Sequence, residues 1–90
     1  MEKIIIKEAL DAILKKDSAL TYNQYIALLT RYQTLRESYE RNKGSRFFIA
    51  EGDSEALRGI IAFLFESCEI TRDQRENLWN VVDTIRAENA

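Results

Sequence analysis

The sequence predicts an all-α protein, a small helical bundle of about four helices arranged as two helical hairpins. Its 90 residues contain three glycines and no proline, so the two strongest helix breakers are rare. Apolar residues recur every three to four positions through most of the chain, which is the spacing of an amphipathic helix. Two capping-box motifs inside the chain mark the starts of helices.

The first predicted helix spans about residues 3–16. Its apolar stripe has helical spacing and consists of Ile6, Ala9, Leu10, Ile13 and Leu14. Lys15 and Lys16 would lie in its last turn, where positive charge interacts favourably with the helix dipole. The run from Ile4 to Ile6 is also compatible with the start of a strand, but no partner strand is evident in the sequence.

The second predicted helix begins after Thr21, which has the capping-box spacing to Gln24. It is expected to continue to about Lys43, with Gly44 as the left-handed residue that ends it. Such a helix of roughly 22 residues is about 33 Å long at 1.5 Å per residue. It is longer than the first helix, so part of its surface is expected to stay uncovered.

The third predicted helix starts after Gly52, with Asp53 or Ser54 as its cap, and ends near Ser67. Apolar residues occupy nearly its whole circumference: Leu57, Ile60, Ile61, Phe63, Leu64 and Phe65. A helix of this kind lies in the centre of a core or is shared with a partner. A fourth helix begins after Thr71, the first residue of the second capping box.

The chain is short enough to form a single helical domain. It is predicted to consist of a hairpin over 1–43, a link over 44–52 and a hairpin over 53–90. Shifting the sequence by fifty residues aligns several identical or similar positions, among them Leu20 with Ile70, Thr21 with Thr71, Gln24 with Gln74 and Leu28 with Leu78. Shared capping boxes explain part of this match, so a duplicated hairpin and two unrelated hairpins are both open interpretations.

Catalysis is not expected of this sequence. It contains no histidine and one cysteine, Cys68, so the commonest base near neutral pH and the usual Cys/His metal sites are missing. The neighbouring carboxylates Glu66 and Glu69 disfavour a reactive thiolate. We therefore expect no catalytic residue, no metal and no cofactor. An enzyme that uses Asp73, Glu76 or Cys68 is the weakest alternative.

A stripe of tyrosines suggests a binding surface on the second helix. Tyr25, Tyr32 and Tyr39 fall one heptad apart, with Leu28 and Leu35 between them. The stripe can pack within the bundle, or it can form an interface, where tyrosine is a favoured residue. Because this helix is expected to be longer than its neighbours, the hypothesis is that Tyr32, Leu35 and Tyr39 contact a second copy or a target.

The link between the hairpins combines basic and aromatic residues. Residues 31–46 contain five basic and two acidic side chains, whereas residues 51–69 contain five acidic and one basic. This asymmetry is suited to steering a charged partner, or to a head-to-tail contact of two copies. Basic residues beside aromatics also suit phosphates and stacked bases. The alternative is a solvated loop whose apolar part, residues 47–49, packs under the bundle.

The predicted function is that of a non-enzymatic protein–protein interaction module. It would act as a small inhibitor or adaptor that occupies a partner protein, and it would self-associate as a homo-oligomer, a dimer in the simplest case. The predicted contact residues are Tyr25, Tyr32, Leu35, Tyr39, Arg41, Lys43, Arg46 and Phe47. The alternative is a protein that binds nucleic acid or nucleotide phosphate through Arg41, Lys43 and Arg46. By analogy of class alone, phage-encoded inhibitors, immunity proteins and antitoxin-like adaptors are similar small helical proteins.

Neither a membrane span nor a strongly charged chain is expected. The longest apolar run, from Ile60 to Phe65, is far shorter than the roughly 20 residues that a membrane span needs. The first four residues lack the features of a signal peptide, so a cytoplasmic location is expected. The net charge of −2 excludes a strongly basic nucleic-acid binder and a polyanionic DNA mimic.

Overall fold

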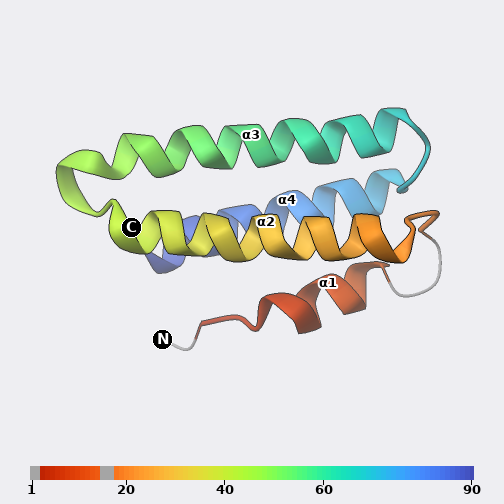
Figure 1. Cartoon of the computed structure of the whole chain (residues 1–90), viewed down its shortest axis with the longest axis horizontal. Coiled ribbons are helices and arrows are strands. Elements are labelled where there is room, and N and C mark those ends of the chain that lie inside the picture. The colour runs from red at the N-terminus through yellow and green to blue at the C-terminus, as the bar shows by residue number, and fades with distance from the viewer. Residues whose placement is uncertain (1–2, 15–17) are drawn as a thin grey trace.

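The structure, a computed structural model, describes residues 3–14 and 18–90 and shows them as a helical bundle (Figure 1). Its elements are α1 (Ile6–Leu14), α2 (Tyr22–Arg41), the short 3-10 turn η1 (Gly44–Arg46), α3 (Phe47–Glu66) and α4 (Arg72–Glu88). These described residues contain four α-helices and no strand, so the predicted all-α class is confirmed. The molecule measures 39 × 25 × 21 Å along its principal axes.

α2 and α4 form the centre of the bundle, and α2 contacts α1, α3 and α4. Successive helices run in opposite directions, so α1 with α2 and α3 with α4 form the two predicted hairpins (Figure 1). α4 also contacts α3 and α1, and α1 therefore rests on both α2 and α4. In Figure 1, α3 lies on the side of α2 that is opposite to α1.

Both predicted capping boxes are present at the starts of α2 and α4. The Thr21 hydroxyl accepts a hydrogen bond from the Gln24 amide at 3.1 Å, and the Gln24 side chain accepts one from the Thr21 amide at 2.8 Å. Thr71 and Gln74 repeat this arrangement at 3.1 and 2.7 Å. The side-chain amide of Gln24 also donates to the Glu69 carboxylate at 2.8 Å, which joins the two hairpins at this end.

α1 is shorter than the helix predicted over residues 3–16, because the chain before Ile6 is not helical. Ile4 is held by side chains from two other helices. Its amide donates to the Glu88 carboxylate at 3.2 Å, and its carbonyl accepts from the Arg36 guanidinium at 2.8 Å. These bonds satisfy the backbone of Ile4 outside a helix. The predicted last turn, with its two lysines, lies outside the described residues.

α2 ends at Arg41, two residues before the predicted end at Lys43. The side chain of Asn42 explains this end, because its amide nitrogen donates to the Ser38 carbonyl at 2.8 Å and satisfies an acceptor of the last turn. Gly44 does adopt the predicted left-handed conformation, with φ of 72°. It begins the turn η1, however, and does not directly follow the helix as its C′ residue.

α3 begins at Phe47, so the prediction of a link over 44–52 and a helix starting after Gly52 is wrong. The turn at Gly44 reverses the chain within a few residues, and the chain can form a helix directly after it. The early start places Ala50 in the core, where it is fully buried. Gly52 then lies inside the helix at a cost of about 1 kcal/mol relative to alanine, which tertiary packing offsets.

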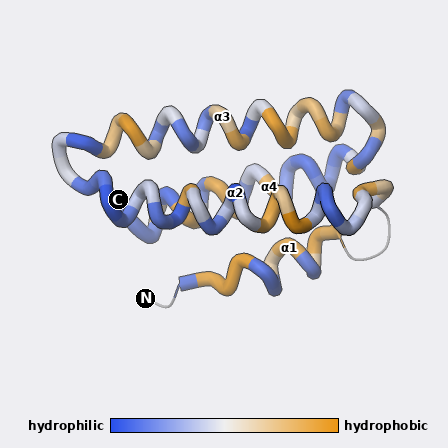
Figure 2. The backbone as a smooth tube through the Cα atoms, in the orientation of Figure 1, coloured by the Kyte–Doolittle hydropathy of each residue, from blue (hydrophilic) through white to orange (hydrophobic). Residues whose placement is uncertain are grey.

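The core runs through the interior of all four helices. Its buried apolar residues are Ile6, Leu10, Leu14, Leu28, Tyr32, Leu35, Tyr39, Ala50, Leu57, Ile61, Ile70, Leu78, Val81, Val82 and Ile85. Hydrophobic residues also recur along α3 outside this core, most densely in its second half (Figure 2). Within the described residues, no helix is long and apolar enough to cross a membrane.

Candidate protein-binding surface

The tyrosine stripe of α2 is part of the core. Tyr32 and Tyr39 have no exposed surface and Leu35 is 2% exposed, so the prediction that these three residues contact a partner is wrong. The reason is that α2 packs against α1, α3 and α4, and these helices cover the stripe from Leu28 to Tyr39. Tyr25, the first residue of the stripe, is half-buried against α1.

Each tyrosine hydroxyl of the stripe has a hydrogen-bond acceptor inside the protein. The Tyr32 hydroxyl donates to the Leu78 carbonyl at 2.6 Å, and the Tyr39 hydroxyl donates to the Glu51 carboxylate at 2.8 Å. Burial raises the pKa of Tyr32, and burial together with the bond to Glu51 raises the pKa of Tyr39 to about 12. Both rings therefore act as structural residues that link α2 to α4 and α3.

The raised tyrosine pKa values predict that alkaline pH destabilises the bundle. Unfolded tyrosines ionise near pH 10, whereas Tyr32 and Tyr39 stay protonated in the folded chain. Their stabilising contribution is complete below pH 10 and is lost as pH rises towards 12. In this pH range each of the two tyrosines lowers the free energy of unfolding by at most about 1.4 kcal/mol per pH unit. Urea unfolding at pH 8, 10 and 11 measures the loss, and Tyr39→Phe should make it smaller.

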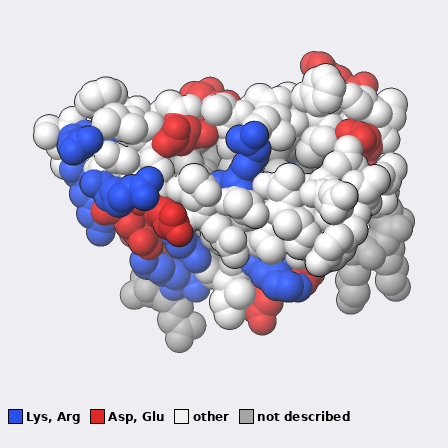
Figure 3. Space-filling view, in the orientation of Figure 1, with Lys and Arg blue, Asp and Glu red and all other residues white. Residues whose placement is uncertain are grey.

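The predicted basic residues lie where α2 meets α3. Arg41, Lys43 and Arg46 are exposed, and we call this group the basic turn. None of the three forms an ion pair with another described residue. Lys and Arg side chains gather at this end of the molecule, at the left of Figure 3. Their charge is therefore available to an external partner.

Two adjacent phenylalanines at the start of α3 have different surroundings. Phe47, which the sequence assigned to the contact surface, is half-buried, and its ring centroid lies 5.3 Å from that of Tyr39. The Arg86 guanidinium lies over the Phe47 ring, 5.5 Å from its centroid. Phe48 is 71% exposed and was missing from the predicted contact residues. Because the predicted helix began after Gly52, the two rings could not be assigned to different surroundings from the sequence.

An exposed surface with two large aromatic rings lies along one side of α3. Phe48 is 71%, Phe63 65% and Ile49 37% exposed, and the residues between them on the same side are small. We call this surface the α3 outer face. It consists of Phe48, Ile49, Gly52, Ala56, Gly59 and Phe63. The spacing of three and four residues is that of one helix face. The sequence did not single out this face, because Gly52 was predicted to end the link and Phe63 belonged to an apolar circumference that suits either a core or a partner.

The other end of α3 carries negative charge. Glu66 is the last residue of the helix and is exposed, and Glu69 follows in the turn to α4. We call these two residues the acidic turn. Between them lies Cys68, which is exposed and has a left-handed backbone with φ of 58°. The turns at the two ends of α3 therefore carry opposite charges, and Figure 3 shows acidic groups both towards the α3–α4 end and among the Lys and Arg side chains at the left.

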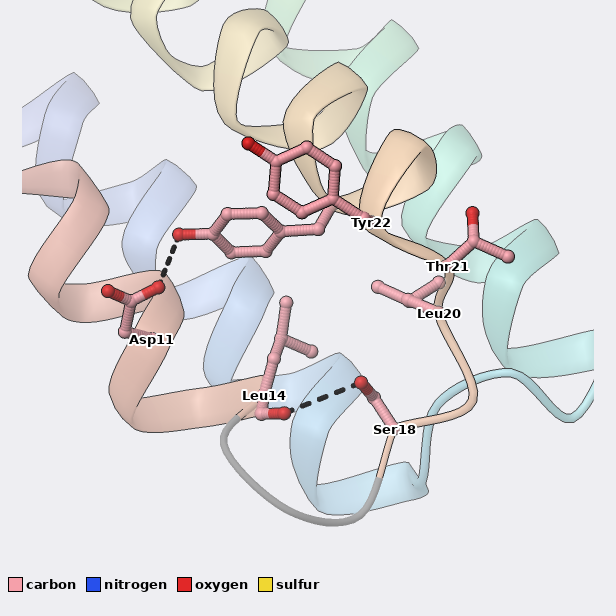
Figure 4. Close-up of a pocket in the computed structure, with 7 residues that line it drawn as sticks. Asp11, Leu14, Ser18, Leu20, Thr21 and Tyr22 are labelled. Carbon is pink, nitrogen blue, oxygen red and sulfur yellow. Dashed lines mark hydrogen bonds between the residues drawn. The ribbon is translucent and has the colours of Figure 1, made fainter.

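An open pocket lies between α1 and the start of α2 (Figure 4). Its lining includes Asp11, Leu14 and the exposed ring of Tyr22. The Asp11 carboxylate accepts hydrogen bonds from Lys7 at 2.8 Å and from Tyr25, and these two bonds lower its pKa. An ionised carboxylate with both partners in place is a weak base. Asp11 is therefore a poor candidate for a general base.

Within the described residues, no three His, Cys, Asp or Glu side chains are grouped to hold a metal ion together. Exposed aromatic and basic side chains make the α3 outer face and the basic turn the strongest candidates for a functional site. Comparison of the chain with protein-family models, curated proteins and solved structures finds no match.

Proposed function

We propose that this protein is a non-enzymatic interaction module that binds another protein chain through the α3 outer face and the basic turn. In this role it acts as a small inhibitor or adaptor that occupies its partner. The observation that supports the proposal is the exposure of Phe48 and Phe63 on one face of one helix. Two solvent-exposed aromatic rings cost a small domain free energy that burial against a partner would recover.

The composition of this surface fits protein recognition. Aromatic residues and arginine are enriched in protein interfaces, and Phe48 lies two residues after Arg46 of the basic turn. The small residues between the rings allow another backbone or a large side chain to approach closely. The aromatic rings and the small residues between them would form the apolar centre of the interface, and the charged turns at both ends would form its polar rim.

Substituting both exposed rings tests this proposal. In Phe48→Ser/Phe63→Ser, protein binding should fall by about tenfold or more, because both apolar anchors are lost. A photoreactive residue in place of Ala56 identifies what binds, and mass spectrometry locates the cross-link on both chains. Tyr22→Ser is the matched control, since its ring is 76% exposed on α2, outside the face. Cross-links that survive in the double variant would contradict the proposal.

Binding of nucleic acid or nucleotide phosphate through the basic turn is the second candidate function. It is favoured by three exposed cations, Arg41, Lys43 and Arg46, beside the exposed ring of Phe48. Fluorescence titration with a labelled single-stranded oligonucleotide tests it. Binding to phosphates should weaken steeply between about 50 and 200 mM salt. Binding by an apolar helix face should change little over the same range.

A further inference from the structure

We infer that the α3 outer face binds a second copy of this chain, with the two α3 helices packed antiparallel about a two-fold axis. The inference rests on the proposed function, since it names the partner of the same surface. Three observations support it: the symmetric placement of residues along the face, two glycines that the fold of one copy does not require, and opposite charges at the two ends of α3.

The face is symmetric about its middle. Phe48 and Phe63 are centred between residues 55 and 56, and so are Gly52 and Gly59. In an antiparallel pair centred at that point, Phe48 lies opposite Phe63 of the other copy, and Gly52 lies opposite Gly59. A two-fold interface requires such self-complementarity, because the same patch is used by both copies. Each aromatic ring then meets a ring, and each glycine meets a glycine.

The glycines provide the second observation. A Cβ atom built on Gly52 or Gly59 meets no other atom within 4 Å, so the fold of one copy has room for a larger residue. Glycine inside a helix is nevertheless destabilising relative to alanine. Close approach of a second helix gives both glycines a role. Together with Ala56, they would let the two helix backbones come near each other at the axis.

Charge complementarity favours a second copy over an unrelated partner. The same centre places the start of α3 in one copy, next to the basic turn, opposite the end of α3 in the other copy, where the acidic turn lies. The basic turn then lies against Glu66 and Glu69 of the acidic turn, and this contact occurs twice in the dimer. A parallel pair would place like charges together at both ends, so the charges also set the direction.

The first experiment measures the oligomeric state of the whole chain. Phe48 and Phe63 are about 22 Å apart along the helix, so the interface is small and we expect a dissociation constant on the order of 10–100 µM. Sedimentation equilibrium from about 5 to 500 µM covers this range. Phe63→Ser should weaken the dimer by about tenfold or more, whereas the control Tyr22→Ser should not. A monomer at every concentration would overturn the inference.

Glycine substitutions separate the interface from the fold. Gly52→Ala/Gly59→Ala should raise the melting temperature measured on dilute, monomeric protein, because alanine is the better helix former. The same variant should weaken the dimer by about tenfold, because two methyl groups enter the close contact. Unchanged dimerisation in this variant would refute the antiparallel arrangement, and circular dichroism confirms that the helices are intact.

Charge reversal tests the direction of packing. Arg46→Glu and Glu66→Arg should each weaken the dimer by about two- to fivefold, the range of exposed ion pairs. The double variant Arg46→Glu/Glu66→Arg should restore it, since the two sites face each other between copies. Failure to restore would contradict this packing.

The inference and the proposed function fail separately. If the chain is monomeric but the Ala56 probe still cross-links to another protein through the α3 face, only the second copy is excluded. If the chain dimerises through another surface and the probe captures nothing, both ideas are wrong. Cross-links from position 56 to position 56 of a second copy support both.

Discussion

Replacing Tyr32 with alanine is expected to lower the melting temperature of the bundle by about 15 to 30 °C. The ring has no exposed surface, and its hydroxyl donates to the Leu78 carbonyl at 2.6 Å. Truncation of a large buried ring costs about 3 to 5 kcal/mol, because the cavity collapses only in part. The free energy of unfolding of a domain of this size is about 5 to 10 kcal/mol, so the substitution would remove a large part of its stability.

Two further substitutions separate the contributions of the ring and of its hydroxyl. Tyr32→Phe removes the hydrogen bond alone and should cost about 1 kcal/mol. Tyr22→Ala, on the same helix but 76% exposed, should change stability by less than about 0.5 kcal/mol. Calorimetry or thermal circular dichroism measures all three variants. Similar effects of Tyr22→Ala and Tyr32→Ala would show that the tyrosine stripe is not buried as described.

Removing either partner of the ion pair between Arg36 and Glu88 is expected to have the second largest effect. The closest N–O distance is 2.9 Å, and the two side chains are 19% and 5% exposed. Arg36→Met leaves the Glu88 carboxylate buried without its cation and should cost about 3 kcal/mol. The same change removes the hydrogen bond from Arg36 to the Ile4 carbonyl.

A double-mutant cycle in urea distinguishes the pair from its separate charges. Arg36→Met/Glu88→Gln should cost less than the sum of the two single substitutions, because no unpaired charge remains. The exposed pair Lys3 with Glu40 is the matched control, and Lys3→Met should cost less than about 1 kcal/mol. Additive costs at Arg36 and Glu88 would contradict a coupled buried pair.

Features set by neighbouring residues could be predicted from the sequence. The caps at Thr21 and Thr71 depend on contacts across three residues, and both are present. The start of α3 depends on the whole fold. Gly52 is a local signal for a loop, yet burial of Ala50 and partial burial of Phe47 favour a helix through it. Tertiary packing outweighed local propensity at this position.

The candidate site was predicted in part. The exposure of Arg41, Lys43 and Arg46 could be predicted, because charged side chains beside a turn are mostly solvent-exposed. The tyrosine stripe was not predictable, because a heptad pattern is the same for a core and for an interface. Whether the stripe is buried in the core or exposed as an interface depends on where the other helices lie. Phe48 was missed for a related reason, since its direction depends on where α3 begins.

The hydrogen bond between Ile4 and Glu88 has a consequence for the order of folding. It joins residues 84 positions apart in the sequence, whereas α2 and α3 are joined by a short turn. Closing a longer loop costs more chain entropy, and an isolated helix of nine residues such as α1 is marginal in water. We therefore expect α1 to dock last during folding and to detach first, with the fastest amide hydrogen exchange of the four helices.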